Sequence, residues 1–142
     1  MTDALLAPSP PELTAPASPA HIIRSDLEAI EVAQRLAATF KLNAQRRDTE
    51  RLLPWQELED CARSGLLAIR VPREYGGAYV SYLTLTRVVA AIGEADASIG
   101  QLLLSIILAS SVIEAVGRDE QKQLFFGKIL QGYRWGNGHA EG

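Results

Sequence analysis

The sequence has few of the residues that bind metals or form disulfides. It contains one cysteine and two histidines in 142 residues. The histidines, His21 and His139, lie near opposite ends of the chain and outside any metal-ligand spacing. Cys61 has no second cysteine to pair with, and its helical surroundings favour a packing role over a reactive thiol. We therefore expect no metal site, no internal disulfide and no hydrolase triad.

The net charge is also small. Its formal value of -3 at pH 7 gives no electrostatic reason to expect nucleic acid or an anionic membrane as a partner. A secretory signal is not recognisable either, because the apolar residues 4–7 are interrupted at once by Pro8. A chain of 142 residues is long enough for one domain with its own hydrophobic core. We expect a cytoplasmic protein with one compact domain.

Prolines are concentrated at the start of the chain, where residues 1–20 hold five of the seven. Alanine and serine fill the spaces between them, so this segment has little apolar area to offset the entropy lost on ordering. We predict a disordered tail over residues 1–20. A proline-rich docking ligand is the less favoured alternative, because no PxxP sequence there is flanked by a basic residue.

The remaining chain shows helical periodicity in five stretches. A capping box at Ser25–Glu28 predicts the start of the first helix, which we expect to end near Ala44. The expected helices begin at Ser25, Pro54, Ser81, Ile99 and Arg118. The inward faces predicted for the first, second, third and fifth helices start with Leu27, Trp55, Tyr82 and Leu124.

Two connections have distinct compositions. Residues 45–51 carry mixed charge, which is typical of a solvated helix end and turn. Leu66–Val71 is a short apolar run closed by Pro72, and this pattern predicts a buried connector. The pair Gly76–Gly77 then allows positive φ angles and predicts a tight turn.

The fourth helix, predicted over Ile99–Val116, is apolar almost all round. Such a helix is surrounded by protein or by lipid, and its serines and glutamine argue against a membrane span. We expect it to be the buried central helix. Just before it, Glu94 and Asp96 resemble an acid/base pair, but Asp96 or Ser98 as a helix cap is the favoured interpretation.

The order of these motifs resembles a known family. VPREYGG precedes an amphipathic helix that ends in GEADASIGQ, GRDEQK follows the apolar helix, and the last helix leads into YRWGNGHAEG. Over about residues 21–142 the chain is similar to the N-terminal helical domain of the acyl-CoA dehydrogenase superfamily. Within the superfamily it looks most like the flavin-dependent monooxygenases that acquire sulfur from sulfones and thiophene-type compounds.

The resemblance implies an all-α orthogonal bundle of about five to six helices over residues 21–132, with residues 133–142 as the first strand of an absent middle domain. Family members add that β-barrel-like domain and a C-terminal four-helix bundle, which forms a homotetramer, and the flavin lies mostly between the two. The implied cofactor is FAD or FMN, which we do not expect this chain alone to retain. The implied partners are the missing domains or a full-length relative, with a small-molecule substrate.

The resemblance also assigns roles to a few positions. The substrate cavity would be lined by Leu104, Ser105, Ile106, Leu108 and Ala109, although plain core packing is the favoured alternative. Ile106 departs from the polar residue that the sulfur-compound monooxygenases often have there. The flavin would lie near His139, Ala140 and Glu141, and Ala140 lacks the hydroxyl that family members place at that point. No residue is assigned as catalytic.

Three functions stay open at this point. The chain is expected to be the N-terminal part of a flavin-dependent oxidoreductase, inactive by itself. A non-catalytic helical module that binds a protein partner is the first alternative. Part of a true acyl-CoA dehydrogenase is the second.

Overall fold

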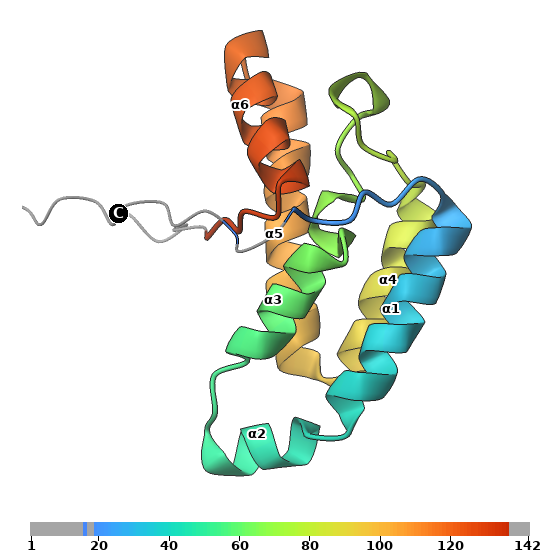
Figure 1. The fold of residues 1–142 in the computed structure, drawn as a ribbon, viewed down its shortest axis with the longest axis vertical. Helices are drawn as coiled ribbons and strands as arrows, with labels where there is room; N and C mark the ends of the chain where they lie inside the picture. Colours follow the sequence, from blue (N-terminus) through green and yellow to red (C-terminus); the bar gives the residue numbers. More distant parts are fainter. Residues whose placement is uncertain (1–15, 17–18, 137–142) are drawn as a thin grey trace, which may run out of the picture.

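The computed structural model describes Pro16 and residues 19–136, and in this part the chain forms helices and no strand (Figure 1). The α-helices are α1 (Asp26–Lys41), α2 (Ala44–Glu50), α3 (Trp55–Arg63), α4 (Tyr82–Ala95), α5 (Ala97–Val116) and α6 (Asp119–Leu130). Two short 3₁₀ helices, η1 (Leu66–Ala68) and η2 (Arg73–Tyr75), lie between α3 and α4. The predicted all-α fold is confirmed. Most of the predicted tail and residues 137–142 of the predicted strand lie outside the described residues.

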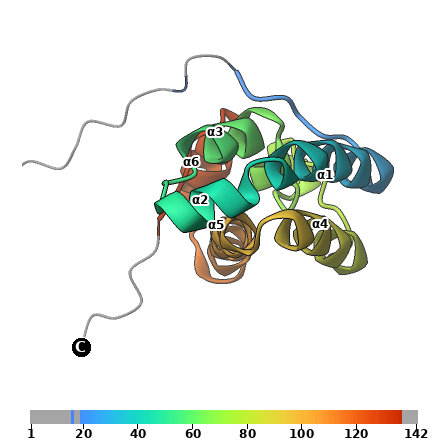
Figure 2. The same ribbon diagram turned by 90° about the horizontal axis from the view of Figure 1, so that it is seen from below.

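The long helices pack in two layers. Figure 2 shows α1 over α4 and α3 over α5, with α2 crossing the end of the bundle. The helix α5 contacts α3, α4, α6 and η1, so four elements meet on one of its sides. The side of α5 that these elements do not cover carries the side chains that remain available to a ligand.

Side chains cap the helix starts largely as predicted. The Ser25 hydroxyl accepts a hydrogen bond from the Glu28 amide at 3.1 Å, and Ser81 accepts one from the Thr84 amide at 3.2 Å. Asp96 caps α5 by accepting from the amides of Ser98 and Ile99, at 3.0 and 3.2 Å. These local bonds fix where α1, α4 and α5 begin.

The predicted capping box at α1 is corrected in one detail. The Glu28 carboxylate accepts from the Arg24 amide at 2.7 Å instead of the Ser25 amide, so the reciprocal bond is shifted by one residue. That bond lowers the pKa of Glu28, with a second contribution from its hydrogen bond to His21. The helix start is still closed from both sides.

Asp26 connects the starts of two helices. Its carboxylate accepts hydrogen bonds from the hydroxyls of Thr84 and Ser81 at 2.7 and 2.8 Å. These bonds, with Thr84 contributing most, lower the pKa of Asp26. They favour the ionised form, so their stabilising effect is present above the unfolded pKa and is lost as pH falls through the folded value.

The predicted buried connector is confirmed. Every residue of Leu66–Val71 is buried beneath the helices. Gly65 precedes it with φ 84°. In the predicted turn at Gly76–Gly77, Gly76 has the positive φ, at 94°, and Gly77 does not. Cys61, which packs next to this connector in the core, is fully buried, and burial raises the pKa of its thiol to about 12. The predicted packing role of Cys61 is therefore confirmed.

Four predicted inward positions are wrong. Leu27, Trp55, Tyr82 and Leu124 have exposed fractions of 65%, 65%, 63% and 57%. The first three stand in the first turn of their helices, where a side chain leans back beyond the helix end and finds no turn beneath it. In α6 the buried side chains are Phe126 and Ile129, so its inward face is rotated from the predicted one.

The prediction that α5 is surrounded on all sides is also wrong for this chain. Ile99, Leu103 and Ile107 are fully buried, whereas Val112 and Val116 are 57% and 77% exposed. By length and composition alone α5 could cross a membrane, and the core helix of a folded protein can have the same length and composition. Its contacts with four elements fit a core helix that is covered on one side only.

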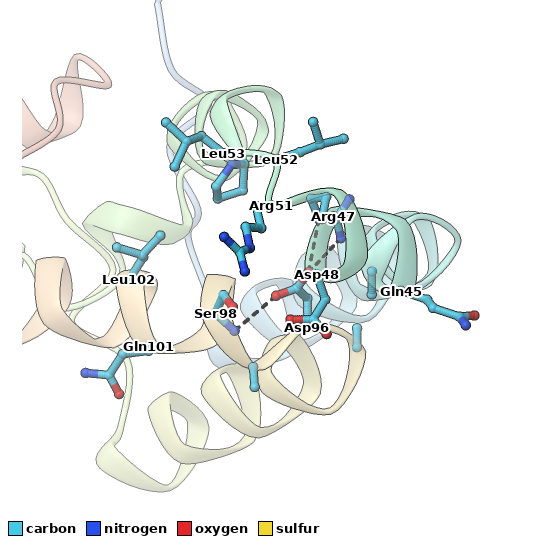
Figure 3. Close-up of a pocket in the computed structure, with 14 residues that line it drawn as sticks. Gln45, Arg47, Asp48, Arg51, Leu52, Leu53, Asp96, Ser98, Gln101 and Leu102 are labelled. Carbon is cyan, nitrogen blue, oxygen red and sulfur yellow. Dashed lines mark hydrogen bonds and ion pairs between the residues drawn. The ribbon is translucent and has the colours of Figure 1, made fainter.

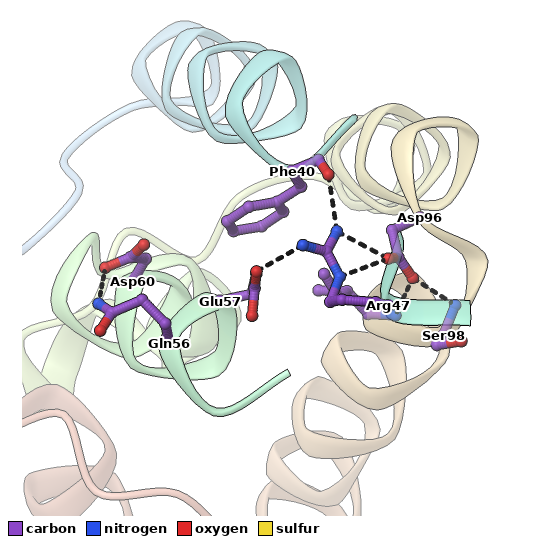
Figure 4. Close-up of polar contacts among 8 residues, drawn as sticks. Phe40, Arg47, Gln56, Glu57, Asp60, Asp96 and Ser98 are labelled. Atoms are coloured by element: carbon purple, nitrogen blue, oxygen red, sulfur yellow. Dashed lines mark hydrogen bonds and ion pairs between the residues drawn. The ribbon is translucent and has the colours of Figure 1, made fainter. Parts of the chain in front are cut away.

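Residues 44–50 form the helix α2, not the predicted solvated turn. Arg47 on this helix is buried, and Figure 4 shows its guanidinium between three other helices. It donates to the Phe40 carbonyl at 2.6 Å, to Asp96 at 2.8 and 3.0 Å and to Glu57 at 2.5 Å. One side chain thus joins the end of α1, the first turn of α3 and the cap of α5.

A second buried arginine lies in the connector. The guanidinium of Arg70 stacks between the rings of Tyr79 and Tyr82, at 4.3 and 4.2 Å from their centroids. It also donates to the Val80 carbonyl at 2.5 Å. This stacking explains why Tyr82 extends over the connector instead of into the core.

Replacing Arg47 with alanine should strongly destabilise the domain. The change leaves the buried Asp96 carboxylate and the half-buried Glu57 carboxylate without their cationic partner. Breaking a buried ion pair costs about 3–5 kcal/mol. Arg46→Ala is the matched control, because Arg46 pairs with Glu50 on the exposed side of α2 and should contribute about 0.5 kcal/mol. Urea unfolding measures both. Equal losses for the two variants would contradict this role of Arg47.

Two helical glycines should respond oppositely to alanine. A Cβ on Gly100 would lie 2.7 Å from the Cα of Gly93, because α4 and α5 cross there, so Gly100→Ala should destabilise. A Cβ on Gly127 would meet nothing within 4 Å, and Gly127→Ala should stabilise α6 by up to about 1 kcal/mol. Thermal unfolding of both variants checks the pair. A stabilised Gly100→Ala protein would show that the crossing is not close.

Candidate functional site

Two hollows lie along the uncovered side of α5, and both are lined by Ser105, Ala109, Trp135 and Gly136. The first, here called the Phe125 hollow, has a volume of about 610 Å³ and is completed by Gln101, Leu108, Val112, Ile113 and Phe125. The second, the Trp55 hollow, has a volume of about 370 Å³ and is completed by Trp55, Leu58, Leu102, Ile106 and Arg134. Both volumes fall in the range of small-molecule sites.

Among the described residues, none of those that line the Phe125 hollow is charged. Its polar side chains are Gln101 and Ser105, and the Ser105 hydroxyl already donates to the Gln101 carbonyl at 2.9 Å within α5. The Trp55 hollow has one cation, Arg134, with a guanidinium nitrogen 3.7 Å from a carboxylate oxygen of Glu59. The pair of hollows is therefore suited to an uncharged, largely apolar ligand.

Trp135 forms the wall between the two hollows. Its ring meets Phe125 edge-on, with centroids 4.9 Å apart and planes at 72°. Next to it, Lys128 lies over the Tyr133 ring at 4.4 Å, so contacts on both sides hold the segment that leaves α6. Among the described residues the buried Trp135 Nε1 has no hydrogen-bond partner. A buried donor of this kind is available to an acceptor on a ligand or on another part of the protein.

Four of the five predicted substrate-pocket residues line these hollows. Ser105 and Ala109 line both, Ile106 lines the Trp55 hollow and Leu108 the Phe125 hollow. Leu104 lines neither and is half-buried on α5. Ile106 also belongs to the core cluster, which agrees with the packing alternative for that residue. The substrate role of all five stays a prediction.

The sequence did not identify the aromatic walls. Trp55 was expected to face the core and Trp135 was placed in a strand, whereas both line the hollows together with Phe125. The available signal was the aromatic Tyr133–Trp135 segment directly after the last helix. Helical periodicity could not place it, because residues 133–136 belong to no regular element.

The described residues do not form a complete flavin site. A flavin needs a flat apolar surface for its ring and donors for its polar edge and phosphate. Trp135 and the α5 side chains offer the surface and one unpartnered N–H group, but the Phe125 hollow supplies no cation. The predicted flavin contacts His139, Ala140 and Glu141 lie outside the described residues. Within residues 16 and 19–136, no group of His, Cys, Asp or Glu could hold a metal ion.

The two tryptophans should report separately on this site. Trp135 is half-buried against Phe125 and Trp55 is largely exposed. A Trp55→Phe protein, which emits from Trp135, should fluoresce at shorter wavelength and be quenched less by acrylamide than a Trp135→Phe protein. The opposite order would show that Trp135 does not form the wall between the hollows.

Comparison with known proteins identifies the chain's family. The family model described as "Acyl-CoA dehydrogenase, N-terminal domain" matches residues 27–133. Dibenzothiophene monooxygenase from Rhodococcus erythropolis is 36% identical over 118 residues, which are 82% of this chain and 28% of the relative. 3-Sulfinopropanoyl-CoA desulfinase from Cupriavidus necator is 27% identical over 107 residues, 75% of this chain and 26% of the relative.

A solved structure has the same fold. Dibenzothiophene monooxygenase TdsC from Paenibacillus sp. A11-2 superimposes with a TM-score of 0.65 at 32% identity, covering 72% of this chain and 26% of TdsC. TdsC has also been solved bound to FMN, and with FMN and indole. This chain thus spans little more than a quarter of the length of the relatives that it matches. It belongs to the acyl-CoA dehydrogenase family and corresponds to that family's N-terminal domain.

Proposed function

We propose that this chain is the substrate-facing N-terminal domain of a flavin-dependent monooxygenase that acts on uncharged aromatic sulfur compounds. The observation that carries the proposal is the uncharged Phe125 hollow, which lies on the uncovered side of α5 and has aromatic walls. Its chemistry suits a planar apolar ring. The identity to dibenzothiophene monooxygenases supports the same substrate class.

In this proposal the chain binds and orients the substrate and contributes no catalytic residue. Ser105, Ile106, Leu108 and Ala109 form the α5 wall, and Leu104 supports it from its half-buried position. His139, Ala140 and Glu141 approach the flavin. The cofactor is FMN, as in TdsC. It is held mainly by residues outside this chain, and it supplies the activation of oxygen.

The uncovered side of α5 is then an internal surface of a longer assembly. Leu108, Val112 and Val116 are exposed along it, and a monomeric soluble protein rarely leaves such a stripe open. Polypeptide corresponding to the family's middle and C-terminal domains, in the same chain or in a full-length relative, covers this stripe. The complete protein is a cytoplasmic tetramer.

Acyl-CoA chemistry is the second candidate, because 3-sulfinopropanoyl-CoA desulfinases also match the chain. The coenzyme A part carries phosphates that bind cationic side chains, and the described residues that line the Phe125 hollow include none. Only the acyl part of such a substrate suits this hollow. An aromatic sulfur compound would occupy the whole of the Phe125 hollow, including the wall formed by Trp135.

A chimera tests the proposal. This chain replaces the corresponding part of TdsC, and the product is supplied with reduced FMN, oxygen and dibenzothiophene. We expect oxygenation, with FMN retained after desalting by the chimera and not by the 142-residue chain alone. Ala109→Trp fills both hollows and should lower kcat/KM by about tenfold or more. Ala90→Trp, at an exposed position on α4, should leave it unchanged.

Two results would contradict the proposal. A folded chimera with bound FMN that oxidises acyl-CoA and leaves dibenzothiophene untouched would favour the second candidate. A chimera that assembles but turns over neither substrate class would favour a non-catalytic interaction module.

A further inference from the structure

A third hollow meets the two discussed above at Gln101 and Leu102. It has a volume of about 810 Å³ and lies between α2, the segment 51–54 and the first turns of α5 (Figure 3). We call it the Arg51 hollow. It is lined by Ala44, Gln45, Arg47, Asp48, Arg51, Leu52, Leu53, Pro54, Ala95, Asp96, Ala97, Ser98, Gln101 and Leu102.

The polar groups at its base are already occupied. Arg47 is bonded to Asp96, Glu57 and the Phe40 carbonyl. The Asp96 carboxylate also accepts from the first amides of α5, so the helix start is closed to an external anion. Any charged ligand must therefore use the side chains around the rim.

Arg51 is the free cation at that rim. Figure 3 shows its guanidinium directed into the hollow, and it has no hydrogen bond or ion pair with any described residue. Its backbone has φ 53° and ψ 42°, the left-handed conformation that glycine normally supplies after a helix. The backbone disfavours an arginine at this position, so we look for a role of its side chain.

The rim is also apolar. Leu52, Leu53 and Leu102 surround the same hollow and are 44%, 69% and 39% exposed. An apolar body placed there would remove these side chains from water. Asp48 lies on the rim as well, so the lining carries two arginines and two aspartates in balance. The lining therefore has no excess positive charge to bind a dianion such as phosphate, and Arg51 is the described arginine of the lining without an ion pair.

We propose that the Arg51 hollow binds a small monoanion with an apolar body, a carboxylate or sulfonate, whose charged group pairs with Arg51. The three leucines bind the apolar body. This site goes beyond the proposed oxygenase function and does not depend on it. It shares Gln101 with the Phe125 hollow and Leu102 with the Trp55 hollow, and Trp135 does not line it.

The test is a titration of the ¹⁵N-labelled 142-residue chain with octanoate, followed by amide chemical shifts. We expect saturable shifts at Arg51, Leu52, Leu53 and Ser98. Acetate, which has the charge alone, and octanol, which has the apolar body alone, should each bind at least about tenfold more weakly. Shifts confined to Ser105 and Trp135, or no saturable shifts, would overturn the proposal.

The decisive variant is Arg51→Gly. Glycine suits the left-handed backbone, so this protein should be at least as stable as the parent while octanoate binding falls by about tenfold. Its loss of binding therefore cannot come from unfolding. Arg46→Gln is the matched control, because Arg46 lies on the helix that Arg51 caps and pairs with Glu50, and binding should not change. Unchanged affinity in Arg51→Gly would overturn the assignment to Arg51.

Discussion

The position of α5 depends on the buried guanidinium of Arg47. This group lies where α1 ends, where α3 begins and where Asp96 caps α5, and it bonds to all three. A buried cation must be paired with good geometry to offset the loss of its hydration, so the three helix ends cannot move independently. Because α4 ends at Ala95 and α5 begins at Ala97, the same bonds also fix where α4 ends.

Once α5 is fixed, its two sides have different environments. One side packs against four elements, with Ile99, Leu103 and Ile107 fully buried. The other side faces the Phe125 and Trp55 hollows and keeps several large apolar side chains in contact with water. The chain spans little more than a quarter of the length of the relatives that it matches. In the proposed complete protein, the open side of α5 faces the substrate and the other domains.

Local chemistry was predictable from the sequence, and distant contacts were not. The caps at Ser25, Ser81 and Asp96 depend on residues two or three positions away, and each is present. The role of Arg47 depends on partners 10 and 49 residues away, which no local pattern reveals. A run of mixed charge therefore indicated a solvated turn, where the fold has a buried ion pair.

The candidate site shows the same division. The family resemblance assigned Ser105 and Ala109 to a substrate cavity, and both line the hollows. Which face of α5 stays open is decided by how many helices the chain supplies to cover it, and the hydrophobic pattern alone implied full burial. The most direct measurement is a crystal structure of the TdsC chimera with FMN and dibenzothiophene. The account predicts substrate rings against Ser105 and Ala109 with Trp135 beside them. A substrate that touches no residue of α5 would contradict it.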